Sequence, residues 1–336
     1  MAEEKKTAYK PIEVTAADDG QRLDRWLQNK FPGVGYPIIQ KALRKGEVRL
    51  DGKRAEGKAR LSEGMQVRLP PVLHHASKPI SERGLTASEI KFAKSMVIYE
   101  DAAIIALNKP SGLATQGGSK TLRHVDRLLE AFADKNGNKP KLVHRLDKDT
   151  SGVLVVAKNR DVAERMGHML KQRDVRKTYV ALTVDVPKAH EGMMRHPLLK
   201  TDSGVVVDKE NGKPAKTTYK VLSFSGRDVA LVALRPETGR MHQLRVHLKQ
   251  IKTPILGDEK YGGMAEHSFV EDAARERLWL HALCLHFTHP MTGKQMDLTA
   301  PVPLEMRKWL DEWNMAYPGI TDTNKPFDPM DEIVLQ

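Results

Sequence analysis

The residues best suited to chemistry lie in the stretch LVHRLDKDTSGVLVVAK, residues 142–158. Within it, Asp147 lies between two cations, Arg145 and Lys148, in a charged loop. Neighbouring positive charge favours an ionised carboxylate, which can act as a nucleophile or a general base. Asp149 is only two residues further along a turning loop, so the two carboxylates cannot easily flank a sugar as a glycosidase pair does. The stretch therefore predicts a site with one working carboxylate, Asp147.

Two strands must position this chemistry. Thr150-Ser151-Gly152 predicts a tight turn into a buried strand over residues 153–157, which would fix the Asp147 loop to the core. A later strand over residues 177–184 carries Tyr179. Because side chains alternate across a strand, Tyr179 lies opposite Val180 and its apolar neighbours. We therefore expect Tyr179 to face a cleft and not the main core.

Four stretches resemble one known family. HRLDKDTSG, residues 144–152, closely resembles the HRLD-x-x-TSG signature of the RluA-type pseudouridine synthases. NKPSGL after a hairpin over residues 97–107, the K-x-Y strand, and LRPETGRMHQLRVHL resemble further motifs of that family. The likeness covers nearly all of residues 20–312, and its motifs come in family order. It implies that Asp147 is the catalytic carboxylate, that Tyr179 stacks on the target base and receives or relays its proton, and that Arg245 ion-pairs with Asp147.

The same resemblance implies further contacts and the reaction. Arg145 would fill the stack vacated by a flipped-out uridine, and Leu244, on a helix expected over residues 241–250, would be a further substrate contact. Uridine-to-pseudouridine conversion is an isomerisation without redox change, so no cofactor and no metal are expected. His242 and His247 are five residues apart, which does not match the four-residue spacing of a zinc helix. Whether Asp147 attacks the nucleoside or abstracts a sugar proton stays open here.

The N-terminal part of the chain concentrates positive charge. The whole protein carries 55 Lys and Arg against 43 Asp and Glu, a formal charge of +12, and residues 20–70 contribute +7 of it. Two helices and a strand–turn–strand are expected there, and RLDRWL and LRKGEVRLDGK resemble an S4 RNA-binding domain. Its expected phosphate contacts, at exposed positions of the helices and turn, are Arg25, Lys41, Arg44, Lys45, Arg49 and Lys53.

These patterns predict an α+β protein with two domains. An S4 (αL-type) domain over residues 11–72 precedes a catalytic domain over residues 96–315, which is built on a mixed or antiparallel sheet with a central cleft. Residues 1–10 and 316–336 are predicted to be loose tails, and residues 73–95, rich in Pro, Ser, Lys and His, a linker.

Composition limits the partners and the location. The single cysteine, Cys284, allows no intrachain disulfide and no cysteine-based metal cluster, and no apolar run is long enough to span a membrane. We expect a cytoplasmic monomer without membrane association that acts on 23S rRNA, free or pre-ribosomal, because the motifs most resemble the large-subunit rRNA synthase C subfamily. Other rRNA or tRNA uridines, a non-catalytic S4-type assembly factor and a nucleoside hydrolase are the alternatives.

Overall fold

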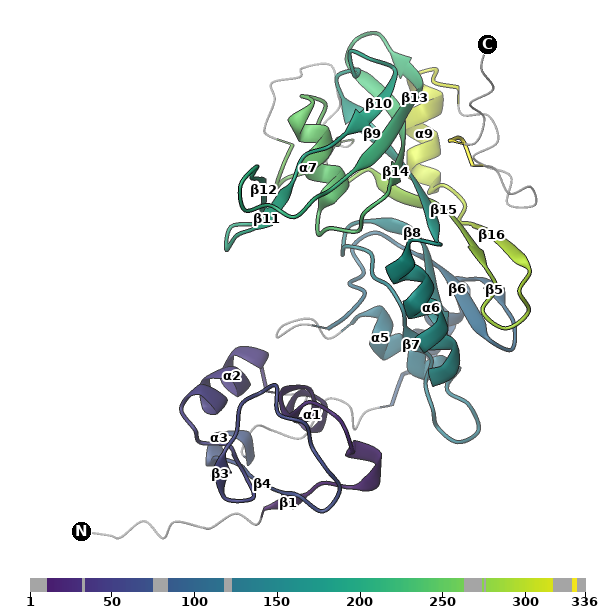
Figure 1. Ribbon diagram of the computed structural model, residues 1–336. Helices are drawn as coiled ribbons and strands as arrows, with labels where there is room; N and C mark the ends of the chain where they lie inside the picture. Colours follow the sequence, from purple (N-terminus) through teal and green to yellow (C-terminus); the bar gives the residue numbers. More distant parts are fainter. Residues whose placement is uncertain are drawn as a thin grey trace. The chain divides into compact units, whose positions relative to one another are not determined.

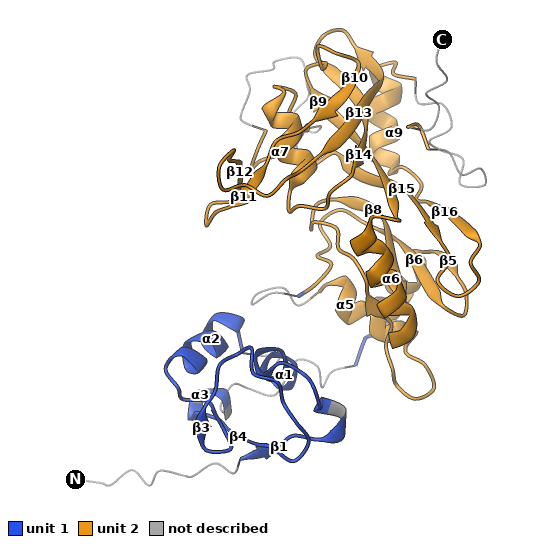
Figure 2. Ribbon diagram, in the orientation of Figure 1, with its two compact units in different colours: residues 1–86, 117–122 blue, residues 87–116, 123–336 orange. Residues whose placement is uncertain are grey.

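The chain forms two compact units, which Figure 2 shows in blue and orange. A computed structural model describes residues 11–31, 34–74, 84–117, 123–262, 274, 276–316 and 328–330. Residues 1–86 and 117–122 make the first unit, and residues 87–116 and 123–336 the second. The predicted N-terminal tail lies outside the described residues. No helix in the described ranges is both long and apolar enough to cross a membrane.

The first unit is a small α+β body with its own core. Its sheet has the strand order β1-β4-β2-β3, and Trp26, Leu27, Ile39 and Val67 are among its buried side chains. Asp51 and Gly52 both adopt positive φ in the tight turn that joins β2 to β3, as an Asp-Gly turn predicts. Its elements are β1 (Ile12–Glu13), a 3-10 turn (Ala16–Asp18), α1 (Leu23–Lys30), α2 (Tyr36–Arg44), β2 (Arg49–Leu50), β3 (Lys53–Arg54), β4 (Gln66–Arg68) and α3 (Pro71–His74).

The second unit is built on one large sheet (Figure 1). Its main order is β10-β13-β14-β9-β15-β8-β6-β5, with β16 added beside β15 and β7 beside β8. All pairs are antiparallel except β8 with β15, so the predicted mixed α+β sheet is confirmed. The strands are β5 (Val97–Glu100), β6 (Ile104–Lys109), β7 (Lys141–Leu142), β8 (Ser151–Ala157), β9 (Arg176–Val184), β10 (Glu191–Met194), β13 (Thr217–Ser225), β14 (Val229–Pro236), β15 (Leu280–Thr288) and β16 (Gln295–Thr299), and β11 (Leu198–Lys200) and β12 (Val205–Val207) form a separate hairpin.

Helices cover both faces of this sheet. On β9, Ala181 packs in the cluster that contains α7 residues Leu244 and Leu248, while Val180 and Leu182 pack in the cluster that contains α9 residue Leu310. Burial of both faces explains why β8 and β14 are almost continuously apolar and why β15 is buried along nearly its whole length. The helices of this unit are α4 (Ala87–Ser95), α5 (Val125–Leu128), a 3-10 turn (Leu129–Phe132), α6 (Arg160–Gln172), α7 (Gln243–Gln250) and α9 (Leu304–Glu312).

The linker predicted over residues 73–95 is wrong over part of its length. α4 (Ala87–Ser95) is a regular helix that belongs to the second unit. It buries Ala93, Glu89 forms an ion pair with Arg127, and the Arg123 guanidinium lies 4.1 Å from the Phe92 ring centre. The helix has few apolar residues, so its stability comes from these tertiary contacts, which periodicity does not reveal.

The predicted loose C-terminal tail also needs correction, because residues 328–330 are fixed to the sheet. The Asp328 carboxylate accepts hydrogen bonds from the Thr178 hydroxyl at 2.7 Å and from Arg235 at 2.8 Å, and it lies 2.9 Å from His286 Nε2. Its other oxygen accepts the Met330 N–H. Burial alone would raise the pKa of Asp328, but these hydrogen bonds and the Arg235 charge hold it well below its usual range.

Replacing Asp328 with Asn is expected to lower the free energy of unfolding by about 2 kcal/mol, because the buried charge-assisted hydrogen bonds are lost. Burial opposes the charged form of His286, yet its hydrogen bonds, with Asp328 first, raise its pKa from 6.5 to about 10. The protonated His286 therefore makes its full contribution to the free energy of unfolding below pH 6.5, and this contribution is lost as pH rises toward 10. Denaturant unfolding should show the largest difference between the variant and wild type from about pH 4 to 6.5 and a smaller one near pH 10. Equal stability of the two proteins at pH 6 would contradict this prediction.

Candidate active site

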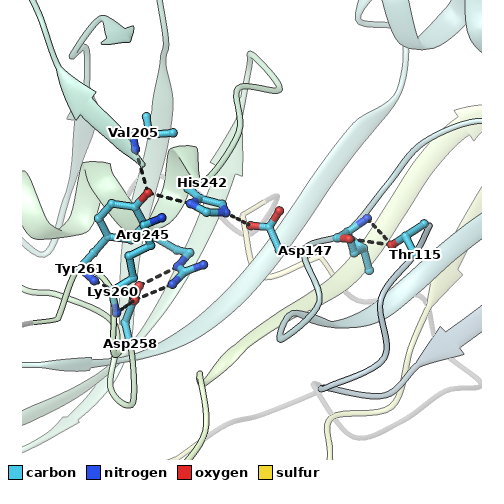
Figure 3. Close-up of polar contacts among 9 residues, drawn as sticks. Thr115, Asp147, Val205, His242, Arg245, Asp258, Lys260 and Tyr261 are labelled. Atoms are coloured by element: carbon cyan, nitrogen blue, oxygen red, sulfur yellow. Dashed lines mark hydrogen bonds and ion pairs between the residues drawn. The ribbon is translucent and has the colours of Figure 1, made fainter. Parts of the chain in front are cut away.

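The loop that carries Asp147 joins β7 to β8 and is held by the chain segment after β6. The Thr115 hydroxyl donates to the Leu146 carbonyl at 2.6 Å and accepts the Leu146 N–H at 3.2 Å, so it fixes the backbone next to Asp147 (Figure 3). Lys109, the lysine of the NKPSGL stretch, is fully buried and donates to the carbonyls of Pro110, Leu113 and Lys148. Burial lowers the pKa of Lys109 to about 7, against the opposite effect of Asp149 and Asp147. The loop is thus tied to buried groups on both sides of Asp147.

Strand register brings Tyr179 toward this loop. Ala282 on β15 pairs with Gly152 of β8 on one side and with Tyr179 of β9 on the other. Gly152 has a φ of +113°, and a Cβ added there would lie 2.1 Å from the Ala282 carbonyl oxygen. Only glycine permits this close approach. The TSG turn therefore sets the lateral spacing between the Asp147 loop and Tyr179.

The third element is the turn into α7. This helix begins at Gln243, two residues later than expected, because His242 adopts a left-handed conformation with a φ of 52°. The Gln243 side chain accepts hydrogen bonds from the Thr238 hydroxyl and the Arg240 N–H, and it donates to the Lys216 carbonyl. This network fixes the turn that brings His242, Leu244 and Arg245 to the cleft.

These elements enclose a cleft of about 570 Å³. Asp147, Tyr179, Arg145, Leu244 and Arg245 all line it, so the structure brings together every site residue predicted in the second unit. The side chain of Asp147 is 31% exposed, which leaves its carboxylate accessible to a ligand. The other cations that line the cleft are Lys171, Arg173, Lys177 and Arg240, against one further carboxylate, Glu237. Such a lining suits a polyanion.

The ion pair expected between Arg245 and Asp147 is wrong in its partner. Arg245 instead makes a two-pronged pair with Asp258, with N–O distances of 2.8 and 2.6 Å. Asp258 also accepts the N–H groups of Lys260 and Tyr261. A buried carboxylate with these donors in place gives the guanidinium better-formed hydrogen bonds than the partly exposed Asp147. Asp147 still acts on Arg245 through its charge, since it helps to raise the pKa of that guanidinium.

Tyr179 lines the cleft as a protonated phenol. Burial, assisted by the negative charge of Asp147, raises the pKa of Tyr179 well above its ordinary value of 10.0. Its ring packs in the cluster of Leu244 and Leu280. At neutral pH the hydroxyl can therefore donate a hydrogen bond, and it can receive a proton only while passing its own proton on.

Several residues of the site were missed by sequence reasoning. The His242 imidazole lies close to the Asp147 carboxylate, with 3.8 Å between Nε2 and Oδ2, whereas its place in the sequence indicates only that it does not fit the spacing of a zinc helix. Asp258 and Tyr261 lie in GDEKYGG, where the signal available in the sequence was a run of three charged residues shortly after an apolar pair, Ile255-Leu256. Among the described residues, no group of three or more His, Cys, Asp or Glu side chains could hold a metal ion.

This geometry defines a class: an α+β protein in which an accessible carboxylate, Asp147, and a protonated tyrosine, Tyr179, line the same cation-rich cleft. A family model described as RNA pseudouridylate synthase matches residues 103–250. The ribosomal large subunit pseudouridine synthase C of Escherichia coli (strain K12) is 37% identical over 92% of this chain and 98% of its own length, and that of Vibrio vulnificus (strain CMCP6) is 34% identical over 90% and 96%. A solved structure of human RNA pseudouridylate synthase domain containing 4 superposes with a TM-score of 0.60 at 30% identity, covering 70% of this chain and all of that one. The chain belongs to the RNA pseudouridylate synthase family.

Proposed function

We propose that this RNA pseudouridine synthase isomerises uridines in ribosomal large-subunit RNA. The observation that carries the proposal is that Asp147 and Tyr179 line one cation-rich cleft in a chain of this family. The large-subunit substrate is supported by identities of 34–37% to synthases C over most of both chains. The bases and their RNA context are identified by the experiment below.

The chemistry needs one carboxylate and one base contact. The bond between N1 and C1′ of uridine breaks, C5 bonds to C1′, the C5 proton leaves and N1 gains a proton, so the product is an isomer. Attack by Asp147 on C1′ and abstraction of a ribose proton by Asp147 both require the accessible carboxylate that the cleft provides. Tyr179 donates to or relays a proton at the base, with Leu244 packing beside it.

Binding uses the cations around the carboxylate. Arg145 is exposed two residues before Asp147, where it can enter the base stack as the uridine swings into the cleft. Lys171, Arg173 and Arg240 are also exposed and can bind flanking phosphates. The shape of the RNA and the charge of its phosphates thus determine binding, while the cleft recognises the extruded base.

The first unit is proposed to act as an S4-type RNA-binding domain. Its six predicted phosphate contacts are all exposed on α1, on α2 and its C-terminal cap, or on the β2–β3 hairpin: Arg25, Lys41, Arg44, Lys45, Arg49 and Lys53. The first unit has an apolar core of its own, so these phosphate contacts and the residues that line the cleft lie in different units. We expect this surface to contribute affinity without taking part in the reaction.

Replacing Lys41, Arg44 and Lys45 together with Ala is expected to weaken RNA binding and to reduce the dependence of log K on log salt by about 2, since each lost phosphate contact removes about 0.7 for single-stranded RNA. The rate at saturating RNA should stay within about twofold of wild type. Affinity measured from 50 to 300 mM salt, beside single-turnover rates, tests both statements. An unchanged salt slope would remove these three residues from the RNA interface.

The experiment that tests the function is pseudouridine mapping across all rRNA and tRNA of cells that lack this chain. Loss of pseudouridine at defined large-subunit positions, restored by the wild-type gene, is the expected result. Loss of pseudouridine only in tRNA or small-subunit RNA would contradict the proposed large-subunit substrate. Purified protein that releases free uracil from RNA would be a hydrolase, and a protein that binds RNA without changing it would be a non-catalytic assembly factor.

A further inference from the structure

His242 connects Asp147 to a buried tyrosine (Figure 3). Its Nε2 lies 3.8 Å from Asp147 Oδ2, and its Nδ1 lies 2.7 Å from the Tyr261 hydroxyl oxygen. That oxygen accepts the Val205 N–H at 3.1 Å. A line of polar groups therefore runs from the β12 backbone through two side chains to the carboxylate of Asp147.

The chemistry of these groups fixes the direction of every hydrogen in the line. An ionised carboxylate only accepts, so His242 must carry its hydrogen on Nε2 to stabilise Asp147. Burial lowers the pKa of His242 despite the negative charge of Asp147, so the ring is neutral and its Nδ1 is an acceptor. The Tyr261 hydroxyl then donates to Nδ1, which leaves its oxygen free to accept from Val205. Each group has one role, and none conflicts with its neighbour.

The same groups hold the imidazole rigidly. The ring of Tyr261 meets that of His242 edge-on, with 5.4 Å between centroids, and the Arg245 guanidinium lies 4.9 Å from the Tyr261 ring centre. Arg245 and the Tyr261 N–H are both bound by Asp258. The Arg245–Asp258 pair therefore acts on Asp147 indirectly, as the support for Tyr261 and His242.

We propose that His242 is a positioning residue that orients the Asp147 carboxylate through its Nε2–H and is held in the required tautomer by Tyr261. The proposal rests on the proposed function. In the free protein the 3.8 Å separation is longer than a hydrogen bond, and it is expected to shorten when RNA fills the cleft, as catalytic contacts commonly do. A carboxylate that turns away from its target by about 1 Å loses about 10²-fold in rate, which sets the expected effect.

The test compares three variants by single-turnover pseudouridine formation on the mapped RNA, with RNA affinity measured separately. His242→Phe keeps the ring without a donor and should slow the reaction ~30- to 100-fold while RNA affinity stays within about twofold. His242→Gln places an amide N–H close to the position of Nε2 and should recover the rate to within about fivefold of wild type. Tyr261→Phe removes only the hydroxyl and should slow the reaction by about 3- to 10-fold.

The outcomes separate this proposal from the function itself. A His242→Phe rate within about twofold of wild type would overturn it, and so would equal losses in His242→Gln and His242→Phe. A fall in RNA affinity that accounts for the whole loss would make His242 an RNA contact instead. If His242→Phe fails to fold, the other two variants test the proposal: a wild-type rate in Tyr261→Phe, or a His242→Gln rate far below the expected fivefold limit, would contradict it. Wild-type protein that forms no pseudouridine would reject the proposed function before any variant is compared.

Discussion

Replacing Asp147 with Asn is expected to slow pseudouridine formation by at least about 10³-fold, a rise of about 4 kcal/mol in the activation barrier, because an amide cannot replace the Asp147 carboxylate as nucleophile or base. RNA affinity should stay the same or rise slightly, since one negative charge leaves a cleft lined by cations. The fold should survive, because Asn is nearly isosteric and the backbone carbonyl of residue 147 still accepts the Thr150 N–H. The measurement is a single-turnover time course with excess enzyme.

Asp149→Asn provides the matched control. It makes the same chemical change two residues away on the same loop, at an exposed side chain that does not line the cleft. We expect its rate to stay within about twofold of wild type. If Asp147→Asn reacted within about tenfold of wild type, a barrier change of about 1.4 kcal/mol, Asp147 would have only a structural role.

The strands and the direction of Tyr179 could be predicted because local patterns determine them. Alternation along β9 correctly placed Tyr179 opposite Val180 and Leu182, since period-two patterns report which residues share a face. The loop–turn–strand around Asp147 followed from the TSG turn and the apolar run of β8. Patterns of this kind are local, so a single sequence contains all the information that they need.

Partners that are distant in the chain could not be predicted in this way. The ion pair of Arg245 depends on whether Asp147 or Asp258 offers the better-formed set of hydrogen bonds. Arg245 pairs with Asp258, whose carboxylate is already oriented by two backbone N–H groups that donate to Oδ1. Asp328 reaches Thr178 across 150 positions of sequence, and the surrounding Pro- and Asp-rich composition indicates only a loose tail. Tertiary contacts decide both cases.

The site shows a similar division between side chains that face the cleft and side chains that hold the surrounding backbone in place. Sequence motifs identified the side chains that face the cleft, Asp147 and Tyr179, because their types suit the chemistry. The sequence patterns did not indicate Lys109, although its side chain donates to three carbonyls, including that of Lys148 in the loop that carries Asp147. Periodic patterns of apolar residues do not indicate that a single lysine is buried. The role of Lys109 is therefore visible only in the structure, where the two loops that it joins lie together.

Replacing Tyr179 with Phe is expected to reduce the single-turnover rate by about 10²- to 10⁴-fold, the usual contribution of a positioned proton donor or relay. The ring remains in the cluster with Leu244 and Leu280, so the fold and base stacking should be retained and RNA affinity should change by less than about threefold. Because its raised pKa keeps the phenol protonated at neutral pH, the loss should be similar from pH 6 to 9, where wild-type Tyr179 stays neutral.

Tyr219→Phe makes the same change on β13 of the same sheet, at a tyrosine whose hydroxyl donates to the Ala189 carbonyl and which does not line the cleft. Its rate should lie within about twofold of wild type, so a loss confined to Tyr179→Phe is due to the hydroxyl in the cleft and not to the sheet. A Tyr179→Phe rate equal to wild type would mean that the base exchanges its protons without this side chain. Tyr179 would then act as an apolar wall, and the proton would be carried by another group that lines the cleft or by water.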